Sequence, residues 1–265
     1  MRRLLTLSAC YIAILSAVAL SLGETVPKRC FNNTVVLQNA NGHGSGILFA
    51  RENEVFIWTA AHVVDHAMNS DGSFSEVMVR RGSQIARARV IRCGDSYVAH
   101  DLALLQIIEG SLKGDARFYK AFNEVELGQE IIHCGTPFNV HMNGNYLFFG
   151  HVSYIGRMMS IPFLILEREV DQCDVNVHPG CSGGPIFDAR TGDILGLLSL
   201  GGKPGLTAIV PTRIIYEWAK SHDCLWAFDP LVPLPKSIAV WRADKLDRIL
   251  TIRDTTEVDT RWGNE

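Results

Sequence analysis

The sequence predicts an all-β fold, either a barrel or a sandwich. From residue 34 onward, short apolar runs such as Thr34–Leu37 and Val55–Trp58 alternate with Gly, Asn and Asp. Closely spaced strands separated by turn residues are typical of these folds. The clearest helical pattern comes late, after Thr212, where apolar residues recur at helical spacing. We therefore predict strands along most of the chain, followed by one helix.

The remaining elements follow in order along the chain. Further strands are predicted at Ile47–Phe49, Leu102–Leu105, Ile131–His133, Tyr146–Phe149, Phe163–Leu166 and Ile194–Leu198. Thr212 would cap a helix over residues 212–222, since a Thr before an apolar periodic run is a common helix start. Prolines then interrupt the tail, residues 225–265. We expect this tail to pack on the rest of the fold rather than to bind a partner.

Composition narrows the class of function. The chain has 265 residues, of which 47% are hydrophobic and 20% charged, as in folded globular proteins. A net charge of -3 gives no electrostatic case for binding nucleic acid. No Cys or His cluster has the spacing of zinc ligands, so we expect no metal and no cofactor.

The N-terminus has the pattern of a secretory signal. Arg2 and Arg3 precede the apolar stretch Leu4–Leu22, and the chain turns polar at Glu24. A basic start, an apolar centre and small residues near the end are typical of such signals. We therefore predict a signal peptide over residues 1–23 and a secreted or periplasmic protein. The alternative is an uncleaved anchor that tethers the protein to a membrane, since about twenty apolar residues span a bilayer.

An even number of cysteines follows that segment. They are Cys30, Cys93, Cys134, Cys173, Cys181 and Cys224. In an oxidising compartment this predicts at least one disulfide, although the sequence does not select the pairs.

Peptide hydrolysis by a serine needs a hydroxyl, a neighbouring base, a carboxylate that orients the base, and amides that hold the oxyanion. Within Gly180–Pro185, Ser182 supplies the hydroxyl, and the glycines allow the backbone to aim the N–H groups of Gly180 and Ser182 at an oxyanion. His62 follows one apolar strand and Asp101 begins another. Each has an ordinary explanation alone, as a glycine-rich turn, a packed histidine or a turn-forming aspartate. Together, in the order His, Asp, Ser, they favour a catalytic triad.

These segments resemble a known superfamily. Thr59–His62, Asp101–Leu105 and Gly180–Pro185 resemble the signature blocks of the trypsin/chymotrypsin-like serine proteases. Gly44–Ile47 and Gly135–Phe138 are similar to segments of the HtrA-type branch. The resemblance covers roughly residues 34–220 and implies two six-stranded antiparallel β-barrels with the active site between them. The implied protease domain spans 24–224, with a first barrel at about 34–118 and a second at about 124–211.

The resemblance also implies roles for residues. His62 would act as general base and acid, Asp101 would orient it, and Ser182 would form an acyl-enzyme with a protein or peptide substrate. The pocket for the residue before the scissile bond, P1, would lie near Asn176, Ser199, Leu200 and Gly201. No Asp stands at the position that gives trypsin its basic specificity, so we expect a small or apolar P1 residue.

Other residues near these segments are expected to be structural, namely His66, His100 and His178. Cys181 stands where digestive relatives carry an Asp, so we expect no trypsin-style zymogen activation. Cys181 is also a rival nucleophile, but Ser182 is favoured because Gly183 and Gly184 follow it directly. We expect no PDZ domain after the protease domain, and the oligomeric state stays open. The predicted function is a secreted serine endopeptidase; the alternative is a catalytically silent binding protein with a protease fold.

Overall fold

The computed structural model describes residues 24–39, 42–94, 100–120, 124–138, 144–160, 167–203 and 205–238. The predicted signal segment, the predicted strand at 163–166 and residues 239–265 of the predicted tail lie outside these ranges. Within the described ranges, no helix has the length and apolar character needed to cross a membrane.

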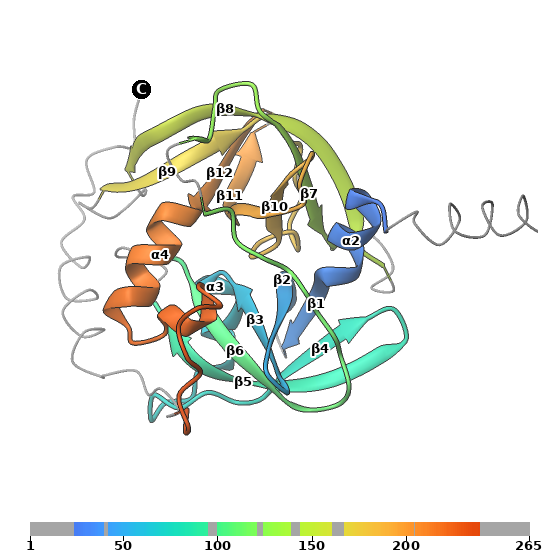
Figure 1. Ribbon diagram of the computed structural model, residues 1–265, viewed down its shortest axis with the longest axis vertical. Helices are drawn as coiled ribbons and strands as arrows, with labels where there is room; N and C mark the ends of the chain where they lie inside the picture. Colours follow the sequence, from blue (N-terminus) through green and yellow to red (C-terminus); the bar gives the residue numbers. More distant parts are fainter. Residues whose placement is uncertain are drawn as a thin grey trace, which may run out of the picture.

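Six antiparallel strands close the first barrel, in the order β1-β2-β3-β6-β5-β4 (Figure 1, lower half). They are β1 (Thr34–Asn39), β2 (Gly42–Arg51), β3 (Glu54–Thr59), β4 (Val77–Arg81), β5 (Gln84–Cys93) and β6 (Ala103–Glu109). In β5 the side chains of Ala86, Ala88 and Val90 are buried, whereas Arg87 and Arg89 between them reach the surface. This period of two lets one face of the strand fill the barrel and the other face water.

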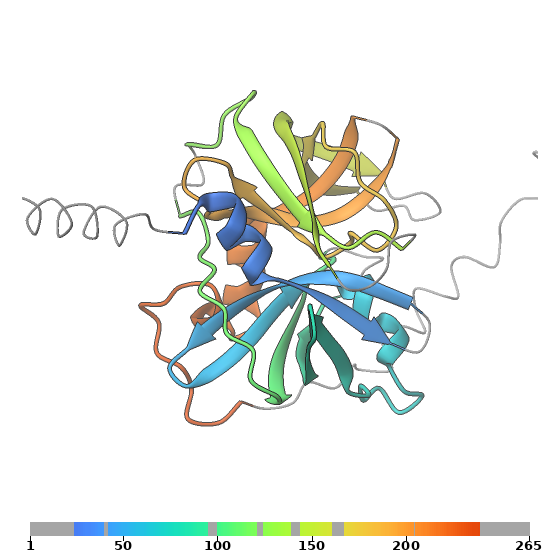
Figure 2. The same cartoon turned by 90° about the vertical axis from the view of Figure 1, so that its right-hand side faces the viewer.

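The second barrel repeats the strand order of the first. Its strands, in the order β7-β8-β9-β12-β11-β10, are β7 (Glu130–Gly135), β8 (Tyr146–Ser160), β9 (Glu167–Cys173), β10 (Pro185–Asp188), β11 (Ile194–Lys203) and β12 (Leu206–Pro211). Figure 2 shows the two barrels one above the other. The predicted fold class is confirmed: two closed, six-stranded antiparallel barrels and a C-terminal helix.

In the described part of the chain, helical segments are few and short. They are α2 (Val26–Asn33), α3 (Ala61–Val64), η1 (Asp65–Ala67), α4 (Thr212–Ser221) and η3 (Leu225–Ala227). The sequence analysis does not predict α2. The helix predicted at 212–222 is α4, but Pro211 is its N-cap and Thr212 is already helical, so the prediction that Thr212 caps it was wrong.

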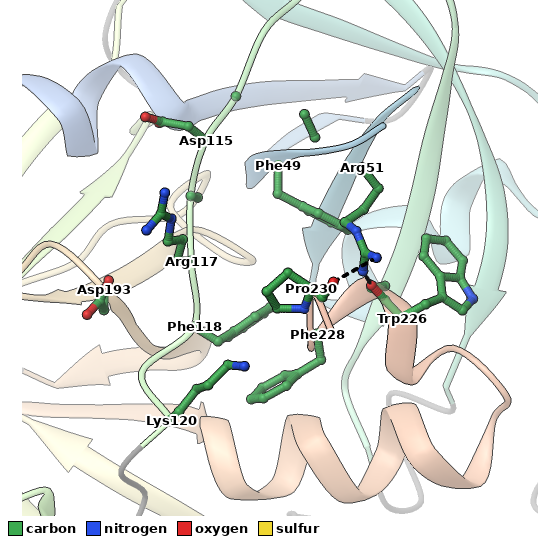
Figure 3. A pocket seen from close by; sticks show the side chains of 14 residues that line it. Phe49, Arg51, Asp115, Arg117, Phe118, Lys120, Asp193, Trp226, Phe228 and Pro230 are labelled. Atoms are coloured by element: carbon green, nitrogen blue, oxygen red, sulfur yellow. Dashed lines mark hydrogen bonds between the residues drawn. The ribbon is translucent and has the colours of Figure 1, made fainter. Parts of the chain in front are cut away.

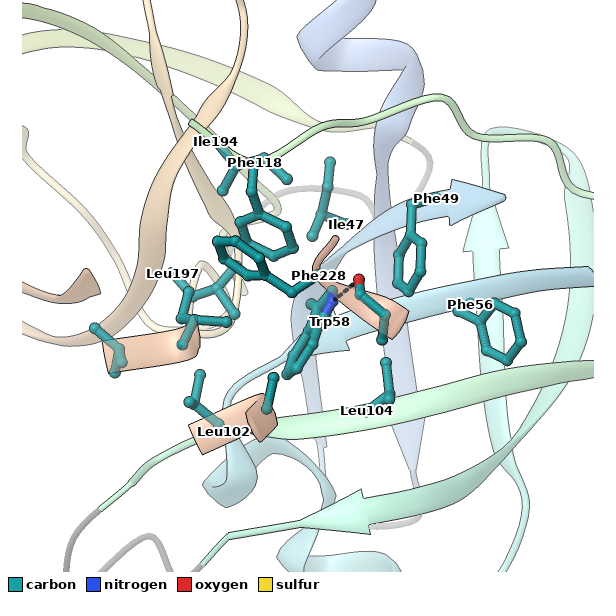
Figure 4. Close-up of a cluster of buried hydrophobic side chains, with 14 of the residues drawn as sticks. Ile47, Phe49, Phe56, Trp58, Leu102, Leu104, Phe118, Ile194, Leu197 and Phe228 are labelled. Carbon is teal, nitrogen blue, oxygen red and sulfur yellow. Dashed lines mark hydrogen bonds between the residues drawn. The ribbon is translucent and has the colours of Figure 1, made fainter. Parts of the chain in front are cut away.

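Three apolar clusters stabilise the fold, and the largest lies between the barrels. Trp58 of the first barrel meets Phe118 and Trp218 edge-on, with ring centroids 5.9 and 5.7 Å apart. Phe118 stacks on Phe228 at 4.4 Å, and Figure 4 shows both rings beside Trp58. The Trp58 indole N–H donates to the carbonyl of Ala227 at 3.0 Å. This shared core fixes the position of one barrel's loops relative to the other's.

The described part of the predicted tail, residues 225–238, packs on the barrels. Trp226 and Phe228 are buried in the shared core. The Arg51 guanidinium donates to the carbonyl oxygens of Trp226, Asp229 and Val232, the last two at 3.1 and 2.7 Å. These bonds hold the segment against β2.

Candidate active site

The three predicted catalytic residues come from both barrels. His62 is in α3, directly after β3, and Asp101 lies just before β6, so the first barrel supplies both. Ser182 lies in the loop between β9 and β10 of the second barrel. The arrangement of the three residues therefore depends on how the barrels pack together.

The structure brings His62 and Asp101 into direct contact. His62 Nδ1 lies 2.8 Å from Asp101 Oδ2 and 3.0 Å from Oδ1, and the His62 backbone N–H donates to Oδ1 at 3.0 Å. The Asp101 side chain is 3% exposed, whereas that of His62 is 37% exposed. A proton on Nδ1, facing the carboxylate, leaves Nε2 as the acceptor, which is the tautomer a general base needs.

The two groups shift each other's pKa. Burial lowers the pKa of His62, but the hydrogen bond and negative charge of Asp101 outweigh it, so that this pKa is raised. Burial raises the pKa of Asp101, but the hydrogen bond and charge of His62 outweigh it, so that this pKa is lowered. The site thus holds a buried carboxylate that stabilises a positive charge on the imidazole.

Two further side chains support the Asp101 carboxylate, Ser199 directly and Arg168 through Ser199. The Ser199 hydroxyl donates to Asp101 Oδ2, and Arg168 Nη2 donates to Ser199 Oγ at 2.9 Å. Arg168 is only 7% exposed, and its Nε has no partner among the described residues. Ser199 was predicted to lie at the wall of the P1 pocket, and in the structure its hydroxyl binds Asp101. The sequence analysis did not identify Arg168, since no local pattern marks a residue that acts from a distant strand.

The backbone before Ser182 adopts a conformation that glycine alone suits. Gly180 has φ +95°, and a Cβ there would lie 2.4 Å from the carbonyl oxygen of Thr136. The carbonyl oxygen of the preceding residue, Pro179, accepts from the Phe138 N–H at 2.8 Å.

The orientation of the two predicted oxyanion donors follows from the hydrogen bonds of the neighbouring carbonyls. Because N–H and C=O point in opposite directions in a trans peptide, the N–H of Gly180 is turned away from Phe138. Cys181 O accepts from Gly184 N–H at 3.0 Å, which turns the N–H of Ser182 away from Gly184 in the same manner. Neither Gly180 N–H nor Ser182 N–H has a backbone acceptor in the described part of the chain.

Ser45, to which the sequence analysis gave no role, supports this loop. Its Oγ donates to Gly180 O at 2.9 Å and accepts from Thr136 N–H at 3.0 Å, and its own N–H donates to Ser182 O at 2.7 Å. The neighbouring Gly44 lets β2 lie close to Val63 of α3, since a Cβ on Gly44 would be 2.6 Å from both methyl carbons of Val63. The sequence identified Gly44–Ile47 only through its resemblance to the HtrA-type branch. The contacts of Gly44 and Ser45 give a physical reason for these residues at this place.

A neutral histidine lies behind the loop. His133 of β7 is fully buried, and its Nδ1 lies 3.0 Å from Pro185 O, to which Nδ1–H donates. Its Nε2 has no partner among the described residues. Burial lowers the pKa of His133 to about 4. A Cβ at Gly184 would lie 2.9 Å from its ring, so the glycine lets the loop rest directly on the imidazole.

The residues predicted to line the P1 pocket lie in different environments. Asn176 is exposed and Leu200 is 43% exposed. Gly201 lies against Val177, since a Cβ on Gly201 would be 2.1 Å from a Val177 methyl carbon. The Val177 side chain therefore occupies the space between the segment that holds Asn176 and the segment that holds Gly201.

His62 and Ser182 border one cavity of about 230 Å³, together with His43, Val63, His66 and Phe138. A larger cavity of about 670 Å³ contains none of the predicted catalytic residues (Figure 3). Aromatic rings line this larger cavity, and its Arg51 and Lys120 already bind backbone carbonyls and Asp229 respectively. The smaller cavity is thus the one that brings the predicted base and nucleophile together.

All six cysteines are buried free thiols in the structure, so it does not show the expected disulfide. Burial raises the pKa of Cys181 to about 11, which leaves this thiol protonated at neutral pH. His66 is exposed, His100 Nδ1 is buried without a partner among the described residues, and His178 accepts from Cys181 N–H through its carbonyl. No group of three or more His, Cys, Asp or Glu in the described ranges is arranged to hold a metal ion.

Two barrels with this strand order define the chymotrypsin-like class of folds, and the solved structures agree. The structure of the Rv3671c protease in its inactive form aligns with a TM-score of 0.60 at 18% identity, covering 74% of this chain and 91% of that one. The HtrA-type protease AlgW with tripeptide aligns with a TM-score of 0.59 at 22% identity, covering 74% and 62%. At these identities the likeness concerns the fold.

The chain belongs to the trypsin-like peptidase domain family, whose model matches residues 44–197, more than half of its length. It is 30% identical over 163 residues to the serine protease Do-like HtrA of Bacillus subtilis, covering 60% of this chain and 34% of that protein. It is 27% identical over 189 residues to a probable periplasmic serine endoprotease, DegP-like, of Ectopseudomonas mendocina, covering 68% and 35%. The chain thus spans about a third of the length of these relatives. The resemblance seen in the motifs is confirmed.

Proposed function

We propose that the protein is an exported serine endopeptidase that hydrolyses peptide bonds through Ser182, His62 and Asp101. The observation that supports this best is the His62–Asp101 hydrogen bond at 2.8 Å beside a cavity that His62 and Ser182 both border. Membership in the trypsin-like peptidase family supports the same reaction.

In the proposed reaction His62 Nε2 takes the Ser182 proton while Ser182 Oγ attacks the carbonyl carbon of the scissile peptide. The carbonyl oxygen becomes an oxyanion, which accepts hydrogen bonds from the N–H groups of Gly180 and Ser182. The imidazolium, stabilised by Asp101, gives its proton to the leaving amine, and an acyl-enzyme remains. Water then attacks the ester with His62 again as base, which releases the acid and restores the Ser182 hydroxyl.

We further propose that the P1 residue is small. Val177 lies against Gly201, which leaves little depth between the two segments expected to form the P1 pocket. A bulky P1 side chain would have to displace the Val177 methyl groups, whereas Ala or a similar residue would not. The proposed preference for a small P1 residue thus rests on the Val177 side chain as well as on the absence of an Asp from the predicted pocket.

The site of action is proposed to be outside the cytoplasm. The N-terminal segment has the composition of a secretory signal. Several relatives of the chain, among them the DegP-like protein of Ectopseudomonas mendocina, are named periplasmic endoproteases. Proteins or peptides in that compartment are the proposed substrates.

A fluorophosphonate probe tests the nucleophile, because it reacts covalently with an activated serine. The wild-type chain should be labelled, and Ser182→Ala should not. Ser153→Ala, which changes an exposed serine of β8, serves as the matched control and should be labelled like wild type. Cys181→Ala should also be labelled, whereas loss of labelling there with retention in Ser182→Ala would assign the nucleophile to the thiol. A folded wild-type chain that is not labelled would overturn the proposal.

A further inference from the structure

We propose that the 230 Å³ cavity beside Ser182 is a subsite for an uncharged apolar or aromatic side chain of the substrate, on the leaving-group side of the scissile bond. This inference rests on the proposed function and adds a substrate preference to it. The cavity is called the leaving-group cavity below.

The position of the cavity relative to the triad indicates which half of the substrate enters it. His62 has to stand next to the leaving amine, because it protonates that nitrogen. His62, Gly180 and Ser182 all border the cavity. None of the four residues expected to form the P1 pocket borders it. The acyl half of the substrate therefore extends toward Val177, and the leaving half extends into the cavity.

The walls favour an uncharged occupant. Val63, Phe138 and Pro179 give the cavity an apolar lining, and none of its described lining residues is Lys, Arg, Asp or Glu. The Phe138 ring meets the His43 imidazole edge-on, with centroids 4.2 Å apart. His43 Nε2 lies 3.0 Å from Thr136 O, so that nitrogen is already engaged. A charged side chain would thus lose water without gaining an ion pair with a Lys, Arg, Asp or Glu of the described lining.

Phe138 exposes apolar surface beside the cavity. Its side chain is 46% exposed, although it borders the cavity together with buried Val63. A substrate side chain placed between these two residues would remove apolar surface from water on both sides. The volume accommodates one ring or branched chain rather than several residues.

Two glycines keep the cavity open. A Cβ on Gly180 would lie 2.7 Å from His43 Nε2, and a Cβ on Gly42 would lie 3.4 Å from the tip of the Phe138 ring. Any side chain at Gly42 would therefore enter the space beside Phe138. Because the Gly42 backbone does not have a positive φ, Gly42→Val is a usable variant for closing the cavity.

Internally quenched peptides test the subsite. All carry Ala at P1, and two series place Phe, Leu, Ala or Asp at the first or the second position after the scissile bond, with the cleaved bond identified by mass spectrometry. In at least one series kcat/KM for Phe or Leu should exceed that for Ala and Asp by about tenfold, the effect of one well-filled apolar contact. Phe138→Ala and Gly42→Val should reduce this ratio to about twofold or less.

Phe149→Ala is the matched control, because it removes a 66% exposed phenylalanine from β8, outside the cavity lining. It should keep the wild-type preference. Equal kcat/KM for all residues in both series would overturn the subsite, as would a full preference in Phe138→Ala and Gly42→Val. Fluorophosphonate labelling separates the two proposals: labelling without a preference rejects the subsite alone, whereas neither labelling nor cleavage rejects the proposed function as well.

Discussion

His133 couples the stability of the fold to pH, because it is a fully buried imidazole behind the nucleophile loop. Its Nδ1–H already donates to Pro185 O, so an added proton would sit on Nε2, which has no partner among the described residues. His133→Asn replaces this titrating imidazole. The Asn side-chain NH₂ can replace the Nδ1–H donor, but the amide does not titrate.

The expected magnitude follows from linkage. Burial lowers the pKa of His133 from 6.5 to about 4, so the unfolded chain binds this proton at a higher pH than the folded one. The neutral histidine's contribution is therefore fully present above pH 6.5 and is lost as the pH falls toward 4. At pH 5 the loss is about 2 kcal/mol, and it approaches about 3 kcal/mol below pH 4.

The assay is urea unfolding of wild type and His133→Asn at pH 7.5 and pH 5. The variant should be less stable at pH 7.5 by about 1–3 kcal/mol, because it leaves space beside Phe148, which stacks on the imidazole. Between the two pH values, wild type should lose about 2 kcal/mol more than the variant. Other shifted groups, such as His62 and His100, are common to both proteins and cancel in this difference.

A surface variant completes the design. Ser153→Ala changes an exposed serine of β8 that carries no titrating group, and it should show the same pH dependence as wild type. Parallel stability curves for wild type and His133→Asn would refute the reasoning, since they would mean that His133 is not held neutral by the fold.

Three further predictions concern the site and the thiols. Arg168→Gln removes a positive charge that lowers the pKa of His62, so the acid limb of the pH profile of kcat/KM should move to higher pH by as much as about one unit. The control Arg157→Gln, on neighbouring β8, should leave the acid limb in place. An unchanged acid limb in Arg168→Gln would contradict an electrostatic role of Arg168. Val177→Ala should raise kcat/KM for Leu over Ala at P1 by about tenfold, and an unchanged P1 profile would exclude Val177 from the pocket. Burial raises the pKa of Cys181 to about 11 and of Cys30, Cys134 and Cys224 to about 12, so native protein at pH 8 should resist iodoacetamide until denaturant is added; rapid alkylation of the folded chain would count against this packing.

Local patterns in the sequence predicted an all-β class and seven of the twelve described strands, β1, β2, β3, β6, β7, β8 and β11. Strands β4, β5, β9, β10 and β12 were not predicted, and the two-barrel architecture followed from the resemblance. Val55–Trp58 predicted β3, and the apolar residues after Asp101 predicted β6. Helix α2 was not predicted, since Val26–Asn33 is a short segment with few apolar residues. Each of these strands was predicted from residues adjacent in sequence. The motifs that follow the strands identified the superfamily.

Contacts between distant strands could not be predicted in this way. Ser199 of β11 binds Asp101 of the first barrel only after both barrels have packed together, and Arg168 of β9 binds Ser199 in turn. Ser45 and Val177 likewise have roles that depend on segments far away in sequence. The placement of each side chain around the predicted triad is therefore a property of the tertiary structure.

The disulfide prediction relied on an even count of cysteines, which says nothing about their separation. Cys30, Cys134 and Cys224 belong to the cluster between the barrels, whereas Cys93 lies in the first barrel's cluster and Cys173 in the second's. These thiols are buried in apolar surroundings, where a free Cys packs as a small hydrophobic residue.

The apolar cluster between the barrels has a consequence for how the molecule folds. It joins Trp58 of the first barrel, Leu197 of the second and Phe228 of the C-terminal segment. Either barrel alone would expose its share of these side chains to water, so neither half is expected to persist as an independent folding unit. Unfolding should then be a single cooperative transition, in which the first event that separates the barrels also separates His62 from Ser182. Hydrolytic activity would serve as a direct reporter of the fully assembled native state.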